Sequence, residues 1–85
     1  PNMFGLLSSS SDERDLLELT LRNPGLFGVR LRELDLPGES LVLSIKREGE
    51  LLIPHGNTRL EEDDQVSILV HTGASAEVAS LFSRP

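Results

Sequence analysis

Residues 41–70 read LVLSIKREGELLIPHGNTRLEEDDQVSILV, and this stretch decides the fold because it holds three strand-like runs separated by two turns. In the first run, residues 41–46, the side chains alternate with the two-residue period of a pleated strand and not with the 3.6-residue period of a helix. Residues 66–71 alternate in the same way, and residues 55–58, which read HGNT, have the composition of a turn. The stretch therefore predicts a small antiparallel sheet.

The first turn sets the pairing of the first two runs. Glu48-Gly49 predicts a two-residue hairpin loop in which Gly49 takes the positive φ that such loops require. This loop would place Arg47 opposite Glu50, so that an ion pair closes the hairpin. Because Pro54 has no backbone N–H, the second strand should end there or run along an edge of the sheet. The same register predicts two further pairs, Ile45 with Leu52 and Leu43 with Pro54.

Both faces of this predicted hairpin are partly apolar. Strict alternation assigns Leu41, Leu43, Ile45, Leu52 and Pro54 to one face. A single layer of helices covers only one face of a small sheet, so the other face must meet another subunit or stay exposed. We therefore expect a homodimer whose interface includes Val42, Leu51 and Ile53.

The flanking residues complete the predicted fold. Residues 17–22 alternate apolar and polar side chains and predict a first strand, which the Asn-Pro-Gly turn at residues 23–25 ends. Residues 28–36 predict a short helical turn, and residues 74–82 predict a closing amphipathic helix. We expect an α+β domain: a small, mostly antiparallel sheet with a short helix after the first strand and a C-terminal helix.

Composition narrows the classes of function. The chain has 85 residues, which is one small domain, and it has no cysteine and therefore no thiolate metal site. Its net charge of −6 repels phosphate backbones, so nucleic acid is not an expected partner. No apolar run approaches the ~20 residues needed to span a bilayer, so we expect no direct membrane insertion.

The first residues are interpreted separately from the domain. Residues 1–14 predict a linker or the tail of a preceding domain, with a disordered terminus of no further role as the alternative. Residues 15–85 form the predicted domain. Because the chain starts at Pro1 without an initiator Met or a leader, we interpret it as a piece of a longer protein.

Catalytic patterns are missing from the sequence. Two histidines and no cysteine are present, and no serine lies in a Gly-x-Ser-x-Gly elbow, so we expect no enzyme and no catalytic residues. The acidic run at residues 61–64 suggests a divalent cation, but calcium loops space their ligands at alternate positions so that the side chains converge. Four contiguous carboxylates favour a solvated acidic turn, and we assign no metal site.

The order of several short motifs resembles a known family. GVRLRELDLP at residues 28–37, followed by residues 41–64 and a hydrophobic strand, resembles the TrkA-C domain, also called RCK-C. The likeness covers roughly residues 15–85, with Asp63 standing where the family usually has Gly. The resemblance implies a cytoplasmic regulatory module of cation transport that pairs tightly and whose partner is a transporter in the membrane.

A ligand site is predicted beside the apolar hairpin. Basic groups next to an apolar dimer groove, here Lys46, Arg47 and His55, suit a planar anionic ligand. The alternative is that Arg47 only pairs with Glu50 while Lys46 lies over apolar neighbours. Some members of the resembled family bind cyclic di-AMP, so the resemblance implies a cyclic dinucleotide or another anionic nucleotide, which folding does not require. The site residues so implied are Leu43, Ile45, Arg47, Pro54 and His55.

Two functions follow from these expectations. The first is a ligand-sensing and dimerising regulatory domain of a potassium channel or of a cation/proton antiporter. The alternative is a pure oligomerisation or protein-interaction module with no small-molecule ligand. A ligand that changes the stability of the domain would separate the two.

Overall fold

The computed structural model describes residues 13–85. Its elements are β1 (Arg14–Thr20), the 3-10 helices η1 (Pro24–Leu26) and η2 (Leu31–Glu33), β2 (Ser40–Arg47), β3 (Glu50–Leu52), β4 (Gln65–His71), the 3-10 helix η3 (Thr72–Ala74) and α2 (Ser75–Ser83). The linker predicted for residues 1–14 lies outside the described residues except for its last two, and the second of these already begins β1.

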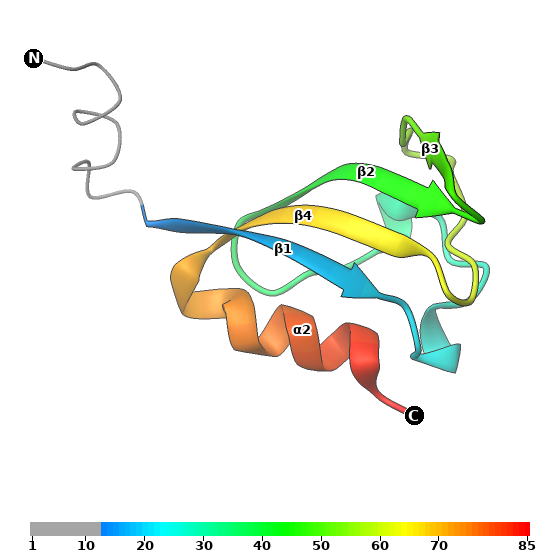
Figure 1. Cartoon of the computed structure of the whole chain (residues 1–85). Helices are drawn as coiled ribbons and strands as arrows, with labels where there is room; N and C mark the ends of the chain where they lie inside the picture. The colour runs from blue at the N-terminus through cyan, green and yellow to red at the C-terminus, as the bar shows by residue number, and fades with distance from the viewer. Residues whose placement is uncertain (1–12) are drawn as a thin grey trace, which may run out of the picture.

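Four antiparallel strands form one sheet in the order β1-β4-β2-β3. Helix α2 lies against one face of this sheet, while the opposite face, called the open face below, is covered by no helix of residues 13–85 (Figure 1). This architecture confirms the predicted α+β class. Over residues 13–85, no helix has the length and hydrophobicity needed to span a bilayer.

The predicted hairpin register is confirmed where β3 exists. Ile45 lies opposite Leu52 and Arg47 lies opposite Glu50. The turn residues Glu48 and Gly49 have φ angles of 51° and 81°, as a type I′ loop requires. Strand β3 ends at Leu52, so the predicted pairing of Leu43 with Pro54 does not form.

The predicted division of side chains between the two faces is wrong at one end of β2. The register with β4 shifts between Val42 and Ser44, so Leu43 is an extra, bulged residue. Val42 therefore pairs with Ile68 and packs against the core, on the same side as the fully buried Ile45. Leu41 and Leu43, which alternation had placed with Ile45, are exposed instead.

The core lies between the sheet and α2. Nine apolar side chains are buried there: Leu21, Ile45, Leu60, Val66, Ile68, Val70, Ala74, Val78 and Phe82. The backbone N–H groups of Arg22 and Asn23 donate to the carbonyl of Phe82 at 2.8 and 3.0 Å, and the side-chain amide of Asn23 donates to the carbonyl of Leu81 at 2.7 Å. These bonds satisfy the last carbonyls of α2 and tie its end to the chain that follows β1.

We predict that Glu48→Asn stabilises the domain. Glu48 occupies the left-handed region at φ 51°, where Asn is far better tolerated and where Asn-Gly is the favoured pair of a type I′ loop. The free energy of unfolding should rise by about 0.5 to 1 kcal/mol, measured by urea denaturation. Glu48→Gln is the control, because it removes the same charge but keeps a side chain poorly suited to positive φ. Equal effects of the two substitutions would contradict the backbone explanation.

Candidate functional site

One edge of β2 is left open where β3 stops. Strand β3 pairs only with residues 45–47, so within the described chain residues 40–43 have no strand beside them on the side away from β4. A cavity of about 470 Å³, called the β2-edge pocket below, lies along this edge. It is lined by Leu31, Arg32, Leu34, Asp35, Leu36, Gly38, Ser40, Leu41, Val42, Pro54, His55 and Gly56.

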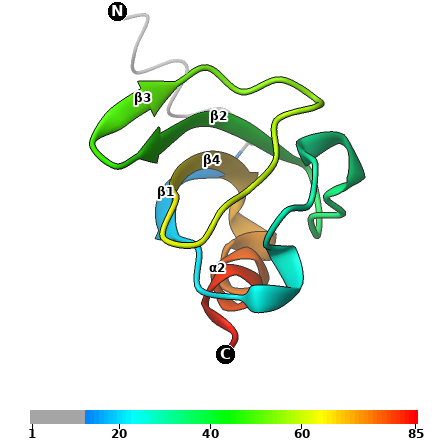
Figure 2. The same cartoon turned by 90° about the vertical axis from the view of Figure 1, so that its right-hand side faces the viewer.

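Two segments far apart in the sequence form the walls of the pocket. An isolated antiparallel bridge joins Arg30 to Arg59. Beyond the bridge, the N–H groups of Leu31 and Arg32 donate to the carbonyls of Thr58 and Gly56, both at 2.9 Å. Figure 2 shows the loop after β3 returning beside the segment that contains η2. The backbone thus fixes the distance between the two walls.

Two hydrogen bonds between its first and last residues close the turn at residues 55–58. The N–H of Thr58 donates to the carbonyl of His55 at 3.1 Å, and the N–H of His55 donates to the Thr58 Oγ1 atom at 2.9 Å. The stem of Arg32 lies beside Gly56, since a Cβ atom built on Gly56 would lie 3.4 Å from the Cβ of Arg32. The turn therefore brings His55 and the stem of Arg32 to the same pocket.

The pocket combines apolar walls with a few polar groups. Arg32 supplies a cation, His55 an imidazole, and Asp35 and Ser40 supply oxygen atoms. The remaining surface is mostly aliphatic, contributed by leucines, Val42 and Pro54. Small-molecule sites typically have this composition, with apolar area for affinity and few polar groups for orientation.

The structure brings together only two of the five predicted ligand residues. Pro54 and His55 line the β2-edge pocket. Leu43 lies exposed on the bulge next to it, whereas Ile45 is fully buried in the core and reaches no surface. Arg47 lies at the other end of β2, where β3 begins.

Arg32 is the pocket cation that the sequence reasoning missed. It belongs to the GVRLRELDLP motif, but its position at the pocket depends on the bridge between residues 30 and 59. No local sequence pattern indicates this bridge. The signal that could have drawn attention to it is the pair of arginines at residues 30 and 32, spaced two apart in a strongly acidic chain.

Arg47 makes a different ion pair from the predicted one. Its Nε and Nη2 groups donate to Asp64 Oδ1 and Oδ2, both at 2.8 Å, and Nη2 also donates to the carbonyl of Arg59 at 2.9 Å. Nη1 lies 3.1 Å from Glu61 Oε2. We call Arg47, Asp64, Glu61 and the Arg59 carbonyl the Arg47 clamp. The predicted Arg47–Glu50 ion pair does not form, although the two residues lie opposite one another.

The clamp is an interior ion pair. The Asp64 side chain is 0% exposed and that of Arg47 is 23% exposed. Hydrogen bonding to Asp64 raises the pKa of the Arg47 guanidinium above its ordinary value, against the opposing effect of burial. Arg47 is therefore charged throughout the pH range in which a protein stays folded.

The acidic run at residues 61–64 is exposed as predicted at its first three residues, but its fourth residue, Asp64, is buried. Asp64 is buried in the clamp, Glu61 contributes to it, and Asp63 accepts from Arg22 at 2.9 Å on the surface. Asp63 also has a φ of 69°, which accounts for the Gly usually found there in the resembled family.

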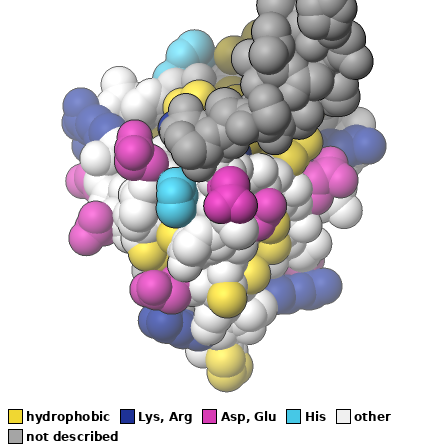
Figure 3. All heavy atoms as spheres, turned by 90° about the vertical axis from the view of Figure 1, so that its left-hand side faces the viewer, with side chains coloured by type: hydrophobic (Ala, Val, Ile, Leu, Met, Phe, Trp, Pro, Cys, Tyr) yellow, Lys and Arg dark blue, Asp and Glu magenta, His cyan; other side chains and the backbone are white. Residues whose placement is uncertain are grey.

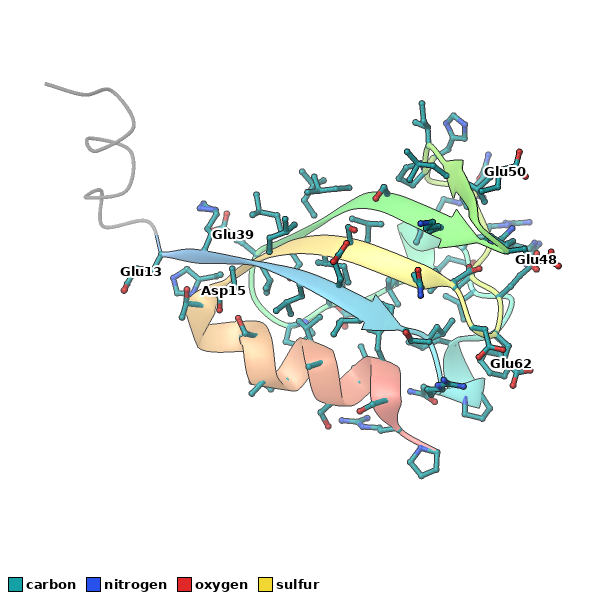
Figure 4. All side chains as sticks on the ribbon, viewed as in Figure 1. Glu13, Asp15, Glu39, Glu48, Glu50 and Glu62 are labelled. Atoms are coloured by element: carbon teal, nitrogen blue, oxygen red, sulfur yellow. The ribbon has the colours of Figure 1, made fainter. Side chains whose placement is uncertain are left out.

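The acidic side chains do not form a cation site. Figure 4 shows Glu48, Glu50 and Glu62 toward the end of the sheet where the hairpin turns, and Glu13, Asp15 and Glu39 at the opposite end. No three His, Asp or Glu side chains in residues 13–85 are arranged to hold a metal ion.

On the open face, an apolar row of side chains that crosses the strands lies next to a polar row. One cross-strand row is apolar and consists of Leu16, Leu69 and Leu41, whereas the next row, Glu18, Ser67 and Ser44, is polar. The exposed large hydrophobic residues of the described chain are Leu16, Leu41, Leu43, Leu51 and Ile53. Figure 3 views the end at which β1 begins, where hydrophobic side chains reach the surface among acidic ones. Of the predicted interface residues, Leu51 and Ile53 are 67% and 80% exposed, and Val42 instead packs on the core.

We predict that Arg47→Ala is strongly destabilising. It leaves the carboxylate of Asp64 buried without its cation, which typically costs about 3 to 5 kcal/mol. Chemical denaturation measures the loss. Arg22→Ala is the matched control, since it cuts an exposed pair at the same corner and should cost about 0 to 1 kcal/mol. Similar losses for the two variants would show that the clamp is no more than a surface pair.

Comparison with known proteins shows the family of the chain. Residues 16–83 match the TrkA-C domain family. The Trk system potassium uptake protein TrkA homolog of Archaeoglobus fulgidus is 30% identical over 67 residues, covering 79% of this chain and 15% of that protein. The putative Na⁺/H⁺ antiporter YjbQ of Bacillus subtilis is 33% identical over 81 residues, covering 95% of this chain and 12% of that protein. A Trk system potassium uptake protein TrkA homolog of Methanothermobacter thermautotrophicus is 25% identical over 83 residues, covering 98% of this chain and 38% of that protein. The chain thus spans well under half the length of each relative.

Solved structures show the same fold. A structure described as an RCK domain with cda has a TM-score of 0.75 and 24% identity, covering 79% of this chain and 96% of that one. The RCK C domain of the potassium transport protein KtrA, solved in complex with cyclic di-AMP, has a TM-score of 0.70 and 24% identity. This match covers 91% of this chain and 92% of that one. With the match over residues 16–83, these likenesses confirm the resemblance seen in the sequence, and the chain belongs to the TrkA-C domain family.

Proposed function

We propose that this chain is a ligand-sensing and dimerising regulatory domain of a cation transport protein, either a potassium channel system or a cation/proton antiporter. The observation that carries the proposal is the β2-edge pocket, in which aliphatic walls meet Arg32 and His55 beside an unpaired strand edge. Membership of the TrkA-C family supports the transport context, and the domain would work on the cytoplasmic side of the membrane.

A cyclic dinucleotide fits the chemistry of this pocket. Its bases are planar and largely apolar and match the leucines and Pro54, while its phosphates match a forked guanidinium and an imidazole N–H. A related RCK C domain was solved with cyclic di-AMP, which makes this compound the first to test. The cation would come from Arg32, since Arg47 is occupied by Asp64.

The open face supports pairing of two copies. Its apolar row of Leu16, Leu69 and Leu41, together with the exposed Leu51 and Ile53, is the kind of surface that marks a protein contact. Leu41 belongs to this row and also lines the β2-edge pocket. A second copy seated on the open face would therefore lie beside a bound ligand.

Regulation would follow from differential binding. A ligand that contacts the pocket more favourably in one arrangement of the two copies shifts the population toward that arrangement. The remainder of the transport protein would respond through the same coupling free energy. Such a mechanism requires binding and coupling alone, with no catalytic step.

We predict that cyclic di-AMP stabilises the domain against heat. A ligand at a hundred times its dissociation constant stabilises by about 2.7 kcal/mol. At about 4 to 8 °C per kcal/mol, the melting temperature should rise by more than about 10 °C. Differential scanning fluorimetry with cyclic dinucleotides, adenine nucleotides, nicotinamide cofactors and divalent cations measures the shift. Arg32→Ala and His55→Ala should remove most of it.

Arg84→Ala is the control for these variants, because it removes an exposed arginine beyond α2 that does not line the β2-edge pocket. A shift that survives Arg32→Ala and His55→Ala would place the ligand elsewhere. A screen in which no compound moves the transition by more than a degree or two would favour the pure oligomerisation module.

We predict a dimer at micromolar concentration that Ile53→Glu converts to monomer. Ile53 is 80% exposed, so a charge there should disrupt a contact between copies without unfolding the chain. Sedimentation at several concentrations measures the change. Ala76→Glu, on the exposed side of α2, adds the same charge and should leave the dimer intact. A wild-type species that sediments as a monomer of 9.3 kDa throughout would contradict the proposal.

A further inference from the structure

We infer that Arg47 is a positioning residue for the β2-edge pocket. It would hold the wall that carries Pro54, His55 and Gly56 at its working distance without touching the ligand. This inference rests on the proposed function of that pocket, and it assigns Arg47 a role different from the ligand contact expected from the sequence.

The wall needs such a restraint. Residues 53–64 join β3 to β4 and contain no helix or strand of their own. Connections of this length inside a compact domain are either tied down or populate several conformations. The pairing of β3 with β2 holds the start of this connection, while the Arg47 clamp holds its end through Arg59, Glu61 and Asp64.

A short path of hydrogen bonds leads from the clamp to the pocket. Arg47 Nη2 donates to the carbonyl of Arg59 at 2.9 Å, and Arg59 forms the bridge to Arg30. Directly before Arg59, the carbonyl of Thr58 accepts from Leu31, and that of Gly56 accepts from Arg32. Arg59, whose carbonyl accepts from Arg47, therefore lies next to the hydrogen bonds that join the two pocket walls.

The clamp engages most of the donors of Arg47. Asp64 Oδ1 accepts from Arg47 Nε, and Asp64 Oδ2 accepts from Arg47 Nη2 and from the N–H of Glu61 at 2.9 Å. Four of the five guanidinium N–H groups face Asp64, Glu61 or the Arg59 carbonyl, which leaves one N–H on Nη1. A lysine keeps the charge but cannot reproduce this fork, so the geometry of the clamp is specific to arginine.

A second ion pair at the same corner provides the contrast. Arg22 Nη1 lies 2.9 Å from Asp63 Oδ1, but both side chains are exposed, at 63% and 65%. This pair joins the corner to the end of β1, and neither residue contacts residues 53–60 through a hydrogen bond that the structure shows. Cutting it perturbs the corner without releasing the pocket wall.

The test uses Arg47→Lys and Asp64→Asn, with Arg22→Ala as the matched control. Each variant is studied at a temperature at which circular dichroism shows it to be folded. Hydrogen exchange then compares the amides of Leu31, Arg32 and Thr58, which close the pocket wall, with the amides of His71 and Thr72, which donate to Glu39 and Glu13 at the opposite end of the sheet. Calorimetry with cyclic di-AMP measures the affinity of the same variants.

We expect protection of the wall amides to fall about tenfold or more in Arg47→Lys and Asp64→Asn, since hydrogen bonds to charged groups are lost. Protection of the His71 and Thr72 amides should change little, because their local opening does not break the clamp. The affinity for cyclic di-AMP should fall in proportion to the fraction of molecules whose wall is closed, and a tenfold loss corresponds to a closed wall in about one molecule in ten. Arg22→Ala should change neither quantity.

Unchanged protection of the wall amides would overturn the inference, and so would an equal loss of protection at His71 and Thr72, because Arg47 would then act on the whole fold. Asp64→Asn keeps the test decisive if Arg47→Lys does not fold. If the wild-type domain fails to bind cyclic di-AMP, the proposed ligand is wrong, and the exchange measurement alone then decides the role of Arg47.

Discussion

The structure depends on a carboxylate that cannot remain in the interior alone. Asp64 is fully buried, and a buried charge costs several kcal/mol unless a partner and hydrogen bonds compensate for it. Arg47 provides two bonds at 2.8 Å, so the end of β2 must lie against the corner that precedes β4. This requirement fixes the path of residues 53–64, and with it the place of the pocket wall.

A second constraint comes from one extra residue in β2. The bulge at Leu43 turns Val42 toward the core and leaves Leu41 exposed, so the strand presents an apolar side chain to each face within two residues. Because β3 ends at Leu52, the bulged half of β2 keeps an unpaired edge. The β2-edge pocket exists where these two features meet, since Leu41 and Val42 both line it.

Local chemistry explains what the sequence predicted and what it did not. The Glu48-Gly49 turn fixes the hairpin register through its positive φ angles, and the hydrophobic periods mark the strands and α2. Strict alternation does not account for an inserted residue, so the face predicted for Val42 was wrong. The partner of Arg47 was also missed, because Glu50 is three residues away in the sequence and Asp64 is seventeen residues away. Burial, which sequence spacing does not record, favours the more distant carboxylate.

The clamp lies at the last residue of β2 and the bulge at its middle, and both connect the pocket to the open face. At the end of the strand, Arg47 belongs to the hairpin that presents the exposed Leu51, and it also donates to the Arg59 carbonyl beside the pocket wall. Before the bulge, Leu41 lines the pocket and belongs to the apolar row of the open face. A displacement of the wall therefore has two short routes to the surface at which a second copy would bind. Packed interiors deform little, so a shift of the wall must be accommodated at that surface or opposed by the clamp.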